Sequence, residues 1–332
     1  MGDFERSRGR ITAMTVVAVT LYAVGSVGAC AIAGFAPVGK RMDRLQWPWL
    51  LLVAVAVLLG MEAYGRAWAG LARAGDGVEL PRGVLRATSR AGFAPVLLRG
   101  GSTVDRHALS ALGRSGREIR IRVASLDALE HVPMAIGCFV LAVVILLRGN
   151  VDPPPLDFVW PWATAPPVGA VLAIWAVARW RTRLADADGW LGRVGSLLQS
   201  VNLLWLVATD RRELGRPFLA MSLFWVAELL ALWSAFEAFD FRIGVGPLVF
   251  AYAVGYVVTR RPAPFGGAGL IDLVLPLCLW DCGVPLATAA AASISYRFLS
   301  LWLPLPGTLR SARRVSSFGA PTAEPEPALQ QP

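Results

Sequence analysis

Long apolar runs recur along the chain and are separated by short polar stretches. The runs that approach the roughly 20 residues needed to cross the hydrocarbon of a bilayer are 11–34, 48–71, 131–148, 166–180, 216–237, 243–259 and 285–305. A further apolar stretch, 268–282, allows an additional crossing. The pattern therefore predicts an all-α fold, a polytopic helical membrane protein with about seven or eight spans.

The polar segments predict how these spans are oriented. Arginines crowd 72–91 and 179–183, whereas 149–165 contains no basic residue. Because basic loops stay on the cytoplasmic side, we place the first two segments inside and the third outside. Apolar residues at helical spacing in 189–210 predict an amphipathic helix on the cytoplasmic surface; a span is the alternative, because the second half, 203–208, is apolar on every face.

Three parts follow from this arrangement. We expect a cytoplasmic N-terminus over 1–10, a membrane domain over 11–310, and a disordered proline-rich tail over 311–332. All basic residues except Lys40 are arginines, a bias typical of GC-rich bacteria. We therefore expect a multi-pass protein of the bacterial cytoplasmic membrane with its N-terminus inside.

Composition excludes several classes of function. Hydrophobic residues make up 55% of the chain and charged residues 17%, more apolar surface than a soluble core uses. The net charge of +9 is spread between apolar runs, so we expect no nucleic acid partner. Zinc-ligand spacing, phosphate-binding loops and nucleophile elbows do not occur. We therefore expect no metal, no cofactor, no ATP-driven transport and no catalytic residues of these types.

Two stretches repeat one pattern of helix-breaking residues. One stretch has Pro95, Gly100 and Asp105 at intervals of five residues. The other has Pro262, Gly267 and Asp272 at the same intervals. A helical stretch, a glycine (Gly113 or Gly283) and a span follow each. Broken segments in corresponding halves indicate a transporter site near the bilayer midplane. We expect related halves, about 48–148 and 216–305, each with a re-entrant broken hairpin; tight loops between spans are the alternative.

Charged residues inside apolar runs are the main candidates for function, because they are costly in a bilayer. Glu228 either pairs with Arg297, contacts a lipid headgroup, or is a protonated, hydrogen-bonded carboxyl. Arg297 either binds a headgroup phosphate with its fork of donors or pairs with Asp272. Glu62 and Arg66, four residues apart, suit a local ion pair.

Two histidines adjoin acidic residues. His107 follows Asp105 and Arg106 in the first broken stretch, and His131 follows Glu130 at the start of a span. Either ring could titrate near neutrality in a proton relay, or could be a packed, hydrogen-bonded residue.

The stretch Pro262-Ala-Pro-Phe-Gly-Gly-Ala-Gly-Leu-Ile-Asp272, with Gly283 and Tyr296-Arg297 after it, resembles the signature of the lysylphosphatidylglycerol synthase transmembrane-region family. The resemblance extends over roughly 11–307 and implies a flippase-like membrane domain that moves lipids between leaflets. Asp272 stands where the family more often has Glu, and Glu130-His131 where Glu-Arg is usual. Full-length synthases of this family append an aminoacyl-transfer domain, which we do not expect 315–332 to form, so the resemblance does not imply synthase activity.

We therefore expect a lipid translocase that moves a phospholipid or a polyprenyl-phosphate-linked lipid between leaflets. The expected substrate-binding residues are Arg297, Asp272, Gly266, Gly267, Gly269, Glu228, Asp105, Arg106, Glu130 and His131. The expected partners are membrane lipids with anionic headgroups, with a second copy of the chain or a lipid-modifying enzyme as protein partners. The alternatives are a membrane enzyme, or partner of one, that uses Asp272 or Glu228 as a base on lipid-linked substrates, and a scaffold without transport.

Overall fold

All regular structure in the described residues is helical. The computed structural model describes residues 2–74, 82–91, 105–106, 108–110, 112–148, 154–180, 182–184, 189–209, 215–258 and 267–315. The long helices are α1 (Gly2–Ala33), α3 (Trp47–Arg73), α7 (Gly116–Arg148), α8 (Leu156–Trp180), α9 (Gly189–Thr209), α10 (Arg216–Glu237) and α13 (Leu286–Trp302). The short helices are α2 (Phe35–Met42), α4 (Arg82–Ala91), α11 (Val245–Tyr252), the π-helical η1 (Ala253–Val258), α12 (Leu270–Asp281) and α14 (Leu305–Val315).

Six helical stretches among the described residues are long and apolar enough to cross a membrane. They are α1 from Thr12 onward, α3, α7, α8, α10, and α13 together with α14. This result confirms the polytopic helical class. The number is lower than the seven or eight expected, because the predicted spans 243–259 and 268–282 form short helices instead.

These short helices do not reach across a bilayer as single elements. Residues 245–258 form α11 and η1, and α12 has 12 residues. At about 1.5 Å per residue the two segments rise roughly 21 Å and 18 Å, against about 30 Å of hydrocarbon. The two segments pack on each other, and α12 also packs on α13 and α1. A pair of half-span helices therefore lies inside a bundle of full-length ones.

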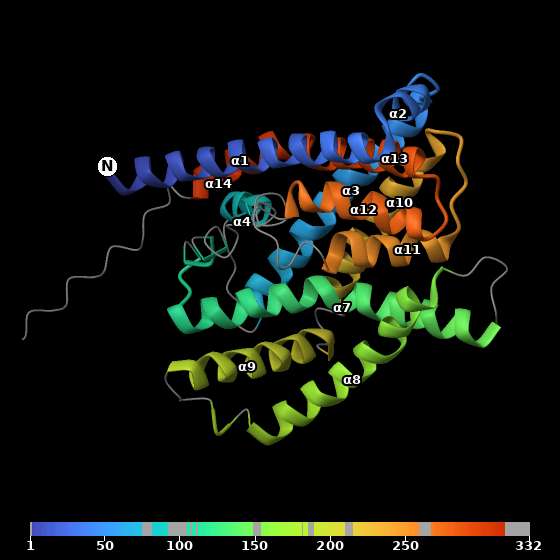
Figure 1. The fold of residues 1–332 in the computed structure, drawn as a ribbon. Coiled ribbons are helices and arrows are strands. Elements are labelled where there is room, and N and C mark those ends of the chain that lie inside the picture. Colours follow the sequence, from blue (N-terminus) through green and yellow to red (C-terminus); the bar gives the residue numbers. More distant parts are fainter. Residues whose placement is uncertain are drawn as a thin grey trace, which may run out of the picture.

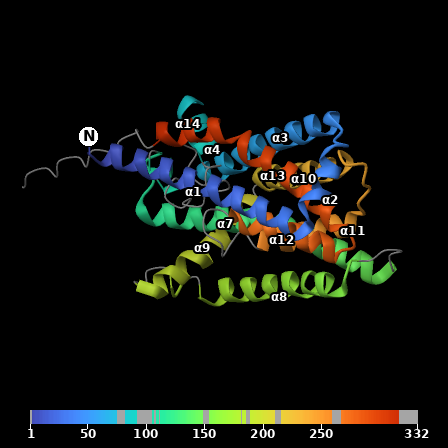
Figure 2. The same ribbon diagram turned by 45° about the horizontal axis from the view of Figure 1, so that its top comes forward.

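The helices form layers (Figures 1 and 2). The central pair is α3 and α10, with α13 beside both, and α1 covers α12 and α13. On the other side, α7 packs on α10 and carries an outer layer of α8 and α9. The outer side of α8 exposes Val171, Ile174 and Trp175, each more than half exposed. Such a continuous apolar exterior suits contact with lipid.

The glycines of the repeat end helical segments in the same way. Gly113 and Gly283 both have a left-handed φ, 74° and 90°. The N–H of each glycine donates to the carbonyl three residues earlier, and the following N–H donates to the carbonyl five residues earlier. This pair of bonds is the Schellman helix ending. A long helix begins three residues after each glycine. The earlier anchors Pro95, Gly100 and Pro262 lie outside the described residues.

Two predicted boundaries differ from the structure. Helix α7 begins at Gly116 rather than 131, and α14 continues to Val315, so 311–315 is helical rather than part of a disordered tail. Helix α9 packs on α7 and α8 but also exposes Leu197, Trp205 and Leu206. Apolar residues therefore lie on its outer side as well as on its packed side, and the packed side also buries Ser200, whose carbonyl accepts a hydrogen bond from the Ser125 hydroxyl of α7. The position of this helix on the cytoplasmic surface stays a prediction.

Helix α1 crosses the start of α12 at close range. A Cβ built on Gly25 would lie 2.3 Å from the carbonyl oxygen of Gly269, and one built on Gly269 would lie 2.7 Å from the carbonyl oxygen of Leu21. Gly269 also has a φ of 81°, which other residues rarely adopt. Two backbones therefore touch here, and neither position has room for a side chain.

We expect Gly25→Ala to lower thermal stability in detergent micelles, with a cost of about 1–3 kcal/mol from overpacking. Gly137→Ala on α7 is the matched control, since a Cβ there meets nothing within 4 Å. The control should be neutral or slightly stabilising, because alanine favours a helix by up to about 1 kcal/mol. Equal melting temperatures for the two variants would contradict the crossing.

Candidate functional site

A buried ion pair joins α12 to α13. The Nε of Arg297 donates to Oδ1 of Asp272 over 2.9 Å. Both side chains are buried, with 8% and 1% exposed. A lone charge is expensive in an apolar interior, and a pair with good geometry offsets much of that cost. In this structure Arg297 thus takes the pairing alternative, with its guanidinium facing a carboxylate of the same chain.

The second oxygen of Asp272 holds the beginning of α12. Its Oδ2 accepts a hydrogen bond of 2.9 Å from the backbone N–H of Gly269, the N-cap residue. An acidic residue in the first turn also suits the positive end of the helix dipole. Asp272 therefore accepts from Arg297 of α13 through one oxygen and from the N-cap of its own helix through the other.

Two of the three expected glycines can be placed. Gly267 and Gly269 lie at the start of α12, while Gly266 is outside the described residues.

The carboxyl of Glu228 lies among tyrosine hydroxyls. Its Oε2 is in hydrogen-bond contact with the hydroxyls of Tyr252, at 3.1 Å, and Tyr296, and these hydroxyls are 2.9 Å from each other. All three side chains are buried. Three mutual contacts between oxygens need three protons, and the two hydroxyls supply two of them. A proton on the carboxyl would complete the ring of hydrogen bonds.

Tyr256 connects the carboxyl cluster to the ion pair. Its ring stacks on Tyr252 with centroids 4.8 Å apart, and the Arg297 guanidinium lies 5.3 Å from its centroid. The polar side chains therefore form one connected set, which we call the buried network: Glu228, Tyr252, Tyr256, Asp272, Tyr296 and Arg297. It draws on α10, α11, η1, α12 and α13. The π-helical turn places Tyr252 and Tyr256 on one side.

The expected residues of the first half form a separate group. Asp105 is buried, accepts a 3.0 Å hydrogen bond from Nε1 of Trp68, and lies within electrostatic range of the Glu130 carboxyl. The backbone carbonyl of Glu130 accepts from Nε1 of Trp225. His131 contacts the Asp127 carbonyl on its own helix through Nδ1. Arg106 is exposed, and His107 lies outside the described residues. The nine expected residues that the structure describes are thus split between two places.

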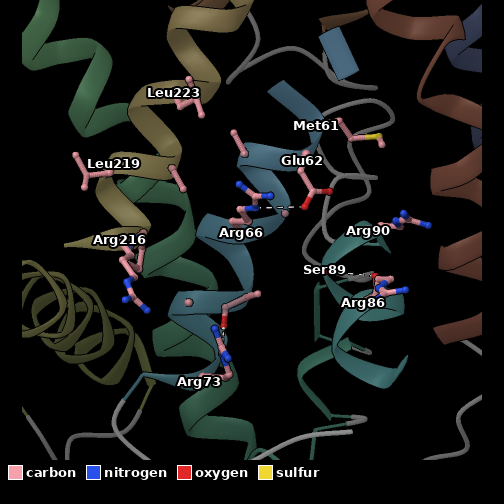
Figure 3. Close-up of a pocket in the computed structure, with 16 residues that line it drawn as sticks. Met61, Glu62, Arg66, Arg73, Arg86, Ser89, Arg90, Arg216, Leu219 and Leu223 are labelled. Carbon is pink, nitrogen blue, oxygen red and sulfur yellow. Dashed lines mark hydrogen bonds and ion pairs between the residues drawn. The ribbon is translucent and has the colours of Figure 1, made fainter. Parts of the chain in front are cut away.

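A pocket that the sequence did not predict lies at one end of the α3–α10 pair (Figure 3). It has a volume of about 920 Å³ and opens between the last part of α3, helix α4 and the first part of α10. Its described charged residues are Arg66, Arg73, Arg86, Arg90, Arg216 and a single acid, Glu62. Sequence reasoning assigned most of these arginines to topology, because they stand in loops and at helix ends far apart in the chain.

Only part of the charge in this pocket is compensated by its described lining. The Nε of Arg66 lies 3.3 Å from Oε1 of Glu62, the predicted ion pair, and both side chains are more than half exposed. The Nε of Arg73 donates to the Ala69 carbonyl, which neutralises no charge. Five arginines against one carboxylate leave the described lining with a net positive charge.

Comparison with known proteins agrees with the resemblance in the sequence. The family model described as lysylphosphatidylglycerol synthase TM region matches residues 12–306, nearly the whole membrane part of the chain. No curated protein matches the chain. The match includes the buried network and the arginine pocket.

We expect Asp272→Asn to destabilise the protein by about 3–5 kcal/mol, because it leaves the Arg297 charge buried without its partner. Asp281→Asn on the same helix is the matched control, since Asp281 is exposed and its loss should be nearly neutral. Thermal unfolding in micelles measures both. A similar melting temperature for the two variants would show that the ion pair contributes nothing to holding α12.

Proposed function

The chain belongs to the lysylphosphatidylglycerol synthase transmembrane-region family, and from this membership and the buried network we propose that it translocates lipid between the leaflets of the membrane. The substrate is a phospholipid or a polyprenyl-phosphate-linked lipid. The arginine-rich end of the bundle, which holds the pocket, faces the cytoplasm in this proposal, because basic segments stay on that side.

The observation that carries this proposal is the position of charged groups beside half-span helices. Asp272 and Gly269 lie at the start of α12, about 18 Å of helix away from the turn that follows Asp281. Measured against a hydrocarbon thickness of about 30 Å, the start of α12 is near the midplane if that turn is at the surface. Broken helices with charges at midplane depth are typical of transporters. We therefore propose that α11 with η1 and α12 are the two arms of a re-entrant hairpin.

In this proposal the headgroup moves from the pocket along a groove between α3 and α10 toward this depth. The pocket extends along both helices as far as Met61 and Leu223. Gly60 precedes Met61, and a Cβ on Gly60 would lie 3.5 Å from Oε1 of Glu228. A glycine at this point keeps the two helices close beside the carboxyl. A headgroup that left the pocket along this groove would meet the buried network next.

The two similar Schellman endings support the idea of two related halves. Gly113 and Gly283 occupy equivalent places in the sequence repeat and share φ and hydrogen bonds. In transporters built from repeats, one half moves against the other around a central site. We propose that the Asp105 group and the buried network are the corresponding polar centres of the two halves.

We expect Glu228→Gln to slow the movement of fluorescent phospholipid between leaflets of proteoliposomes by at least about tenfold, the effect of losing about 1.4 kcal/mol of transition-state stabilisation. A glutamine retains an acceptor and donors for the two tyrosines, so folding should be preserved. The assay follows dithionite quenching of the label at equal protein incorporation.

Glu237→Gln, at the end of the same helix, is the matched control and should translocate lipid at the native rate. Native protein with no activity above empty liposomes, for labelled lipids of several headgroups, would overturn the proposed function. Unchanged activity in Glu228→Gln would instead exclude the buried network from the route.

A further inference from the structure

We propose that the arginine pocket between α3, α4 and α10 binds the headgroup of an anionic lipid, with a preference for a phosphomonoester. This inference rests on the proposed lipid role, but not on movement between leaflets. It assigns a ligand to residues that lie outside the buried network.

The charge of the pocket lining favours an anion. Its described residues carry five guanidinium groups and one carboxylate. Arg86 and Arg90 are on α4, Arg66 and Arg73 on α3, and Arg216 at the start of α10 (Figure 3). Guanidinium groups from three elements can approach a phosphate from several directions, and each fork matches two of its oxygens. A phosphomonoester carries more charge and more free oxygens than a phosphodiester, so it uses more of these forks.

The apolar side of the pocket indicates a lipid rather than a water-soluble anion. Leu219 and Leu223 line the pocket from α10 and are 66% and 50% exposed. Both lie on a helix that is long and apolar enough to span a membrane. A soluble phosphate needs no such surface, whereas the acyl chains of a lipid would cover it. The arginines lie at the helix ends, and the leucines lie one to two turns further along α10. This order matches a lipid whose headgroup contacts the arginines and whose acyl chains contact the leucines.

The size of the pocket fits this ligand. A volume of about 920 Å³ is near the upper end of about 300–1,000 Å³ for small-molecule sites. A phosphate group alone would leave most of this space empty. A headgroup with its glycerol and the first part of two acyl chains fills it better. The exposed Arg66 and Glu62 pair adds a polar part to the lining, which suits contact with a headgroup.

The test is direct lipid binding to the purified full-length chain in dodecyl maltoside, measured by native mass spectrometry. The probes are dioleoyl phosphatidic acid, dioleoyl phosphatidylglycerol and dioleoyl phosphatidylcholine. We expect one site that binds phosphatidic acid at least about tenfold more tightly than phosphatidylcholine, with phosphatidylglycerol between them. Binding should weaken with salt, because the exposed arginines are screened.

Two pocket variants, each compared with a control variant outside the pocket, test whether the arginines and the leucines contact the lipid. Arg86→Gln with Arg90→Gln should weaken phosphatidic acid binding at least about tenfold, while Arg148→Gln with Arg179→Gln, two exposed arginines on α7 and α8, should leave it unchanged. Leu219→Ser with Leu223→Ser should weaken lipid binding, while Leu230→Ser, further along α10 and outside the pocket lining, should not.

Three outcomes would overturn the inference. Equal binding of phosphatidylcholine and phosphatidic acid would exclude an anion site. Full competition by millimolar glycerol 3-phosphate or inorganic phosphate would show a water-soluble anion as the ligand. Unchanged binding in the Arg86 and Arg90 double variant would place the lipid elsewhere. Micelles have no leaflets, so this binding can be present even if translocation fails, and the two proposals are separable.

Discussion

The ion pair between Asp272 and Arg297 is the interaction on which the inner part of the bundle depends. It holds the start of a half-span helix against α13 in surroundings where an unpaired charge would be unstable. The same aspartate satisfies the N-cap of α12 at Gly269, where the backbone of α1 also touches. The arginine in turn lies over Tyr256, whose ring stacks on the tyrosine that contacts Glu228. A broken helix inside an apolar bundle is possible because its polar end is satisfied in this way.

The molecule contains two kinds of electrostatic environment, and they differ in what they can do. In the buried network the charges of Asp272 and Arg297 are matched, and the Glu228 carboxyl is surrounded by hydroxyls. In the pocket the arginines are exposed and outnumber the acid in the described lining. Exposed excess charge attracts a ligand from outside, whereas a compensated buried pair resists opening. The pocket is therefore suited to attracting an anion, and the network to holding α12 against α13.

The sequence predicted the helices better than the site, for physical reasons. Apolar runs of sufficient length predicted the six span-length helices of the described residues, but also 243–259 and 268–282, because hydropathy alone does not distinguish a span from a half-length helix. The pairing of Asp272 with Arg297 was one of two alternatives, because a buried arginine needs an anion from either protein or ligand. Of the tyrosines around Glu228, Tyr296 stood in the family-like signature, but Tyr252 and Tyr256 come from two other helices and carry no local signal. The pocket arginines were interpreted as topology signals, since their convergence depends on how α3, α4 and α10 pack.

The most direct test of the re-entrant hairpin is to measure how deep the start of α12 lies in a bilayer. A nitroxide on Leu270→Cys, in a variant with the four native cysteines replaced, reports depth from its relative access to oxygen and to a water-soluble nickel complex. Leu270 and Trp280 are both about half exposed and are separated by about 15 Å along α12, so the same label on Trp280→Cys gives the reference. A re-entrant hairpin predicts Leu270 near the bilayer centre and Trp280 near the headgroups. Headgroup depth or full nickel access at Leu270 would contradict it and leave the hairpin as a loop outside the membrane.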